Sequence, residues 1–95
     1  MLKVTPAAIS QMKEEMAPYI KDGKEWFIRL YMAIGWGKPN FELALEESAQ
    51  SDDHIIEVDE LRLLIAERDV PYFKGRQLDY AKVHFDVGHF QLQEG

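Results

Sequence analysis

The sequence predicts a mainly β fold: a small sandwich or barrel of about six to seven mostly antiparallel strands with one N-terminal helix. Apolar residues recur at spacings of three and four only near the N-terminus, which is typical of an amphipathic helix. From residue 26 onward the apolar period changes to two, which is typical of strands. Strands do not alternate with helices there, which disfavours a doubly wound α/β sheet. We expect residues 1–95 to form a single domain.

The helix has a clear start signal. Thr5 can accept hydrogen bonds from free amide groups, and Pro6 loses no hydrogen bond at the first helical position. One apolar stripe follows, made of Ile9, Met12, Met16 and Ile20. Because the ring of Pro18 clashes with the preceding turn, we expect a helix over about 6–17. It would continue, kinked, toward Asp22-Gly23.

Two longer strands follow the helix. Trp26 to Ile34 alternates with apolar residues on both faces, and residues 41–46 alternate Phe and Leu with Glu and Ala. The loop Gly35–Asn40, which reads GWGKPN, joins these strands. A polar connector then leads to the second half of the chain.

The alternation of apolar and polar residues predicts further short strands in the second half of the chain. Residues 54–58 and 61–65 would pair around a tight turn at Asp59-Glu60, and 67–75 would form a loop or a single helical turn. Residues 76–85 alternate again. Asp86-Val87-Gly88 would form a hairpin turn in which Gly88 supplies a positive φ, before a last strand over 89–92.

Composition excludes several kinds of function. Seventeen acidic residues against eleven basic ones give a net charge of −6, which disfavours nucleic acid as a partner. The absence of cysteine excludes disulfides, thiolate zinc sites and cysteine nucleophiles. The sequence shows no signal peptide and no apolar run approaching the ~18 residues of a membrane span. We therefore expect a soluble cytoplasmic protein without a membrane partner.

Several segments together resemble the HesB/IscA-like proteins, the A-type carriers of iron–sulfur cluster assembly. The start LKVTPAAISQM is similar to the family's opening strand and helix, and FIRLYM resembles its first long strand. Leu78-Asp79-Tyr80 is similar to a family signature, and Gly88-His89-Phe90 resembles a Gly-Phe step nearby. The similarity extends along essentially the whole chain. It implies a compact β fold with an N-terminal helix, and an activity in binding iron or an iron–sulfur cluster.

The sequence departs from this family at the cluster ligands. The family uses one cysteine in the loop after its first long strand, where this chain has Gly35, Trp36 and Gly37. A Cys-Gly-Cys pair would follow the last strand, where this chain reads QLQEG. The resemblance therefore implies a cysteine-free accessory or binding protein, not a carrier, with no cofactor expected. Its partners would be proteins, among them iron–sulfur assembly proteins, and a homodimer is a further expectation.

Two interpretations of the loop remain open. Trp36 either packs over the end of the barrel or anchors a partner protein, as exposed tryptophans often do. In the second case, Trp36, Lys38 and Asn40 would be the contact residues.

The remaining hypotheses concern metals and small ligands. His84 and His89 flank the predicted hairpin turn, which contains Asp86, and imidazole and carboxylate groups suit iron or zinc. The cluster Asp52-Asp53-His54 is instead interpreted as a solvated turn. A small-ligand pocket lined by Trp26, Tyr31 and Phe41 is a third hypothesis. No phosphate loop, nucleophile elbow or paired carboxylates indicate an enzyme, so we expect none.

Overall fold

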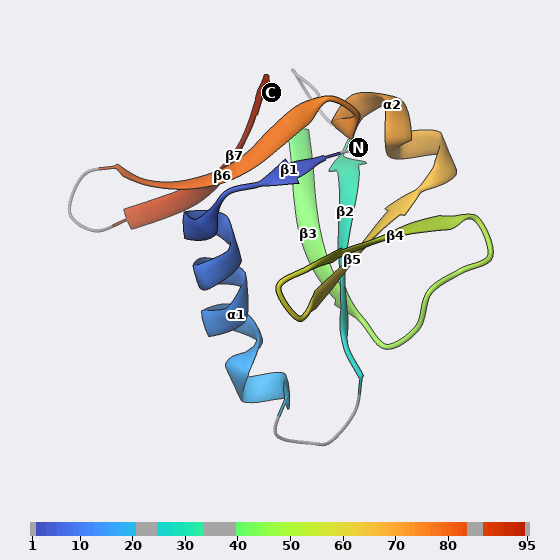
Figure 1. Ribbon diagram of the computed structural model, residues 1–95, viewed down its shortest axis with the longest axis horizontal. Coiled ribbons are helices and arrows are strands. Elements are labelled where there is room, and N and C mark those ends of the chain that lie inside the picture. The colour runs from blue at the N-terminus through green and yellow to red at the C-terminus, as the bar shows by residue number, and fades with distance from the viewer. Residues whose placement is uncertain (1, 21–24, 34–39, 84–86, 95) are drawn as a thin grey trace.

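The computed structural model describes residues 2–20, 25–33, 40–83 and 87–94. Within them, seven strands and two short helical segments accompany one long helix (Figure 1). In chain order these are β1 (Lys3–Val4), α1 (Pro6–Ile20), β2 (Phe27–Ala33), β3 (Asn40–Glu46), β4 (Asp53–Val58), β5 (Leu61–Ala66), the 3-10 turn η1 (Glu67–Asp69), α2 (Val70–Phe73), β6 (Arg76–Val83) and β7 (Val87–Glu94).

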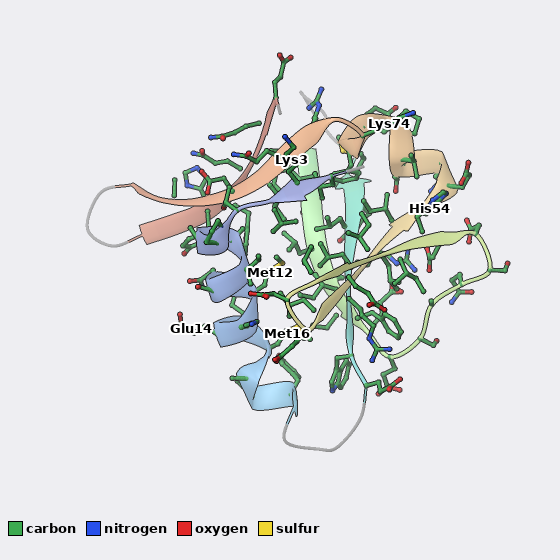
Figure 2. All side chains as sticks on the ribbon, viewed as in Figure 1. Lys3, Met12, Glu14, Met16, His54 and Lys74 are labelled. Atoms are coloured by element: carbon green, nitrogen blue, oxygen red, sulfur yellow. The ribbon has the colours of Figure 1, made fainter. Side chains whose placement is uncertain are left out.

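Helix α1 begins at Pro6, as the sequence predicts, and extends to Ile20, three residues beyond the predicted interruption. Pro18 lies inside the last turn, where few helical bonds remain to be lost. That turn is held from outside, since the Trp26 indole donates to the Tyr19 carbonyl oxygen at 3.0 Å. Figure 2 shows Met12 and Met16 directed toward the interior and Glu14 on the outward side.

The four-stranded sheet has the order β3-β2-β5-β4. Strand β2 pairs antiparallel with β3 and parallel with β5, and β5 pairs antiparallel with β4. The β4–β5 turn contains Asp59 and Glu60 at φ values of 49° and 76°. Two positive φ values between paired strands are the pattern of a type I′ hairpin turn, at the position that the sequence predicts.

The three-stranded sheet has the order β1-β6-β7, with β1 parallel and β7 antiparallel to β6. The predicted turn at Asp86-Val87-Gly88 is wrong in part, because Val87 and Gly88 belong to β7 and pair with Val83 and Lys82. A Cβ built on Gly88 would overlap the ring of Tyr80. Gly88 therefore makes room for an aromatic side chain on the neighbouring strand, and Gly75 is the described glycine with a positive φ.

One cluster of buried side chains joins the two sheets and the helix. It includes Met12 of α1, Leu30 of β2, Leu63 of β5, Phe73 of α2 and Leu78 of β6, each 0–1% exposed. Figure 1 shows α1 running beside β3, with the three-stranded sheet crossing above it. Among the described residues, three of five strand pairings are antiparallel, so the predicted fold class is confirmed. The same residues include no helix long and apolar enough to cross a membrane.

Candidate functional site

A buried ion pair joins β2 to the start of β4. The Arg29 guanidinium donates two hydrogen bonds to Asp53, at 2.7 and 2.6 Å, and a third to Glu46 on β3. The Asp53 side chain is fully buried and also accepts from the Gln50 backbone amide at 2.6 Å. The interpretation of Asp52-Asp53-His54 as a solvated turn is therefore wrong at Asp53, which has a buried cationic partner.

The charges of this cluster stabilise one another. The hydrogen bonds from Arg29 lower the pKa of the Asp53 carboxyl, and the Gln50 amide lowers it further, against the opposing effect of burial. The two carboxylates, Asp53 first, raise the pKa of Arg29. Three Arg29 N–H groups donate to the two carboxylates of this cluster, which we interpret as a structural ion-pair cluster that joins β2, β3 and β4. The sequence signal for this ion pair is Arg29, the one charged residue among the apolar residues of β2.

The Leu78-Asp79-Tyr80 segment has a structural role at the start of α1. The Thr5 hydroxyl donates to the Asp79 carboxylate at 2.6 Å and accepts from the Ala8 backbone amide at 3.2 Å. The Thr5 amide donates to the Leu78 carbonyl oxygen at 2.9 Å. Asp79 thus positions the N-cap of the helix against β6.

The predicted partner-contact loop is described only at its end. Gly35, Trp36, Gly37 and Lys38 lie outside the described residues. Asn40 begins β3, is exposed, and its side-chain oxygen accepts from the Phe41 backbone amide at 3.0 Å.

Of the three predicted metal ligands, the structure describes only His89. His84 and Asp86 lie outside the described residues. His89 is exposed on β7, and its Nε2 lies 2.8 Å from the side-chain nitrogen of Gln91. A different histidine, His54, contacts the exposed carboxylate of Glu67. Within the described ranges, no group of three or more His, Asp or Glu side chains could hold a metal ion.

The aromatic residues predicted to line a small-ligand pocket have other roles. The Trp26 ring lies edge-on to Tyr19, and Phe41 lies edge-on to Phe73. The Tyr31 hydroxyl donates to the Glu42 carboxylate at 2.8 Å, and this bond raises the pKa of Tyr31. None of the three aromatics is among the described residues that line the groove between α1 and β3.

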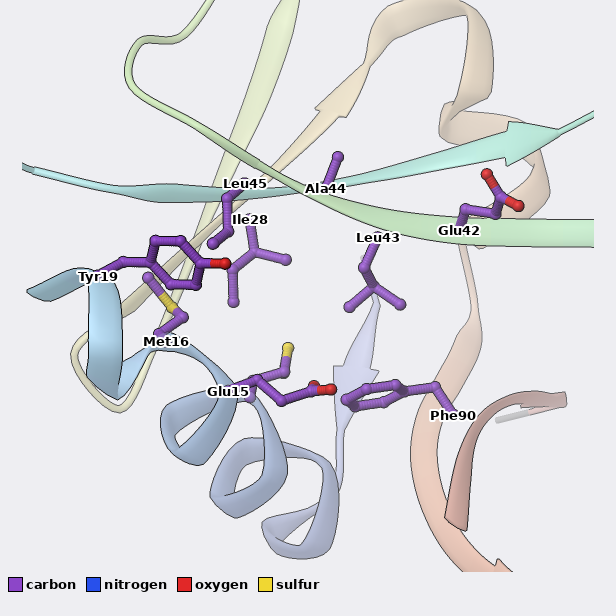
Figure 3. A pocket seen from close by; sticks show the side chains of 10 residues that line it. Glu15, Met16, Tyr19, Ile28, Glu42, Leu43, Ala44, Leu45 and Phe90 are labelled. Atoms are coloured by element: carbon purple, nitrogen blue, oxygen red, sulfur yellow. The ribbon is translucent and has the colours of Figure 1, made fainter. Parts of the chain in front are cut away.

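That groove, of about 750 Å³, lies between α1 and β3 and is called the α1–β3 groove (Figure 3). Figure 3 shows Leu43 and Leu45 pointing across it toward α1, with Phe90 of β7 at one end. Its described lining consists of Met12, Glu15, Met16, Tyr19, Ile28, Glu42, Leu43, Ala44, Leu45 and Phe90. Sequence reasoning missed it because the individual elements look like ordinary amphipathic segments.

Comparison with known proteins gives a result for the fold. No family model matches the chain, and no curated protein sequence matches it. Among solved structures, IscA with the [2Fe–2S] cluster matches with a TM-score of 0.75 and 20% identity, over 99% of this chain and 82% of IscA.

Two further structures give the same result. Escherichia coli SufA, involved in biosynthesis of iron–sulfur clusters, matches with a TM-score of 0.77 and 21% identity over 98% of this chain and 84% of SufA. A protein from Aquifex aeolicus solved by NMR matches with a TM-score of 0.77 and 23% identity, over 99% of this chain and 91% of its own. The fold implied by the sequence resemblance is thus confirmed: this chain has an HesB/IscA-like fold, shared with IscA and SufA.

Proposed function

We propose that this chain is an accessory or binding protein of iron–sulfur cluster assembly that does not itself carry a cluster. The observation that carries the proposal is an HesB/IscA-like fold in a sequence without cysteine. We infer that it acts in the cytoplasm through protein–protein contacts, as a monomer or homodimer, and not as an enzyme.

The donor set of this chain does not fit a [2Fe–2S] cluster. Such clusters are held mainly by cysteine thiolates, with histidine replacing cysteine on one iron in some proteins. The sequence provides no thiolate, and the described residues bring no three candidate ligands together. The proposal therefore assigns the chain contact with assembly proteins and leaves the cluster to its partners.

The proposed contact surface is the loop between β2 and β3. Trp36, Lys38 and Asn40 combine an amphipathic ring, a cation and an amide, and aromatic residues often dominate binding energy at protein interfaces. Asn40 is exposed at the start of β3, next to this loop.

Affinity purification tests the proposal. The tagged chain should retain identified iron–sulfur assembly proteins, and Trp36→Ala should reduce their recovery at least about fivefold, since interface aromatics contribute strongly. Tyr72→Ala is the matched control, because Tyr72 is 45% exposed on α2 and should leave recovery unchanged. Absence of assembly proteins from repeated purifications would contradict the proposal, and equal losses in both variants would contradict the contact surface.

A further inference from the structure

The α1–β3 groove lies beside a sheet edge that has no neighbouring strand among the described residues. Strand β3 is the terminal strand of the four-stranded sheet, so its outer backbone groups face away from β2. Edge strands with free backbone groups can accept an added strand from another protein. The groove therefore adjoins a possible backbone docking edge.

The two faces of β3 differ in chemistry. Leu43 and Leu45 point into the groove, where Met12 and Met16 form the α1 side. Methionine side chains adapt well to a variable apolar occupant. An added strand would therefore place alternate side chains against this apolar surface.

Two carboxylates define the charge of the groove. Figure 3 shows the Glu15 carboxylate projecting from α1 toward Phe90, and Glu42 on the opposite face of β3 from Leu43. The described lining contains no lysine or arginine, and the chain carries a net charge of −6. A cationic occupant complements this surface, whereas a second copy of this acidic chain would be repelled.

We propose that the α1–β3 groove binds an extended segment of a partner protein that adds to the free edge of β3. The segment has two adjacent basic residues and an apolar residue two positions beyond them. One basic side chain would lie beside Glu42 on the outer face. The next would pass Phe90 to reach Glu15, and the apolar side chain would enter the groove beside Leu45. This inference does not depend on a role in cluster assembly.

Capped peptides containing Lys-Lys-Ser-Leu, or the reversed order Leu-Ser-Lys-Lys, provide the probe, with binding measured by fluorescence anisotropy. Each order has its own matched control, Lys-Ser-Lys-Leu for the first and Leu-Lys-Ser-Lys for the second, with the same composition but without the lysine facing Glu15. At least one order should bind about two- to fivefold more tightly than its control, as expected for one exposed ion pair. Equal affinity of both peptides and their controls, or no binding, would overturn the proposal.

Protein variants locate the binding. The double variant Glu15→Gln/Glu42→Gln should weaken binding about five- to twentyfold. The control Glu14→Gln/Glu57→Gln changes the net charge equally at exposed positions outside the groove lining, and it should leave affinity unchanged. Equal losses in both would show attraction by net charge alone and would overturn the proposal.

The backbone contribution is tested separately. A peptide N-methylated along one edge should lose most of its affinity when that edge faces β3, because strand addition depends on backbone hydrogen bonds. Retained affinity with both N-methylated edges would overturn strand addition. Sedimentation of the free protein tests the competing occupant, which is a second copy of this chain. A dimer that the Glu15→Gln/Glu42→Gln variant abolishes would place the second copy in the groove. That result would also overturn the proposal.

Discussion

At the scale of single residues, the Arg29–Asp53 ion pair combines a fully buried carboxylate with a largely buried guanidinium. The Asp53 side chain is 0% exposed and the Arg29 side chain 15% exposed. Removing one partner of a buried pair leaves an uncompensated charge, which costs more than the intact pair contributes. Asp53 therefore fixes the end of the segment between β3 and β4, because it pairs with Arg29 and accepts a hydrogen bond from the Gln50 backbone amide.

Asp53→Asn should lower the free energy of unfolding by about 2–3 kcal/mol at neutral pH, because Arg29 loses its fully buried counter-ion and retains only the partly exposed Glu46. Urea denaturation measures the change, and Asp52→Asn is the control because Asp52 is exposed. Since the folded-state pKa of Asp53 is lowered, its stabilisation is present above the unfolded-state pKa of about 3.9. That contribution is lost as pH falls through the folded-state pKa, so the difference between wild type and variant should shrink in acid. A pH-independent difference would contradict this assignment.

At the scale of elements, a polar junction at Thr5 joins the start of α1 to the three-stranded sheet. Thr5 caps the helix, contacts Asp79 through its hydroxyl and bonds Leu78 through its amide. The short β1 precedes this junction and pairs parallel with β6. Together with the burial of Met12 and Met16, this contact positions α1, which forms one side of the α1–β3 groove.

Thr5→Val should reduce stability by about 1–2 kcal/mol, because it removes the capping hydroxyl while keeping the branched shape. Thermal denaturation gives the stability, and hydrogen exchange of the first-turn amides should accelerate. Thr5→Ser retains the hydroxyl and should restore both measurements to within about 0.5 kcal/mol of wild type. Identical behaviour of the valine and serine variants would show that the hydroxyl is not the stabilising group.

At the scale of the whole molecule, the fold is that of IscA, but the chain lacks the cysteine thiolates that usually hold an iron–sulfur cluster. The architecture matches IscA across nearly the whole chain, yet no thiolate is present. A fold alone does not determine an activity, which depends on the residues placed in it. The comparison with IscA therefore establishes a shared fold and not a shared chemistry.

Anaerobic reconstitution with iron and sulfide should leave the purified chain without a stoichiometric cluster, because thiolates are missing. The absorption spectrum, the iron content and the acid-labile sulfide content measure this together, with IscA treated in parallel as the positive control. Stoichiometric iron and sulfide that co-elute with the chain would contradict the proposed function.

Much of the fold could be predicted from local patterns. The 3–4 spacing after Thr5-Pro6 predicts α1, and the period of two predicts β2 and β3, because α1 and β3 each bury one face and β2 is covered on both. The hairpin at Asp86-Val87-Gly88 was misplaced because glycine was interpreted as a turn residue. Only the register of β6 and β7 shows that Gly88 instead accommodates the Tyr80 ring.

The candidate site was less predictable. The α1–β3 groove combines a helix, the edge of one sheet and Phe90 from the other, which are far apart in sequence. Similarly, the burial of Asp53 depends on Arg29, 24 positions earlier. Such arrangements follow from tertiary packing, which no local pattern encodes.

The β4–β5 turn has a consequence for the order of assembly. Asp59 and Glu60 occupy positive φ values without being glycine, a conformation that side chains with a Cβ disfavour. Free in solution, this dipeptide would seldom adopt the bend, so it is poorly suited to nucleate the hairpin. We therefore expect β5, which is buried at Leu63 and Ile65, to pack before β4 closes beside it. Upon heating, we accordingly expect β4, a terminal strand of the four-stranded sheet, to be among the earliest parts to detach.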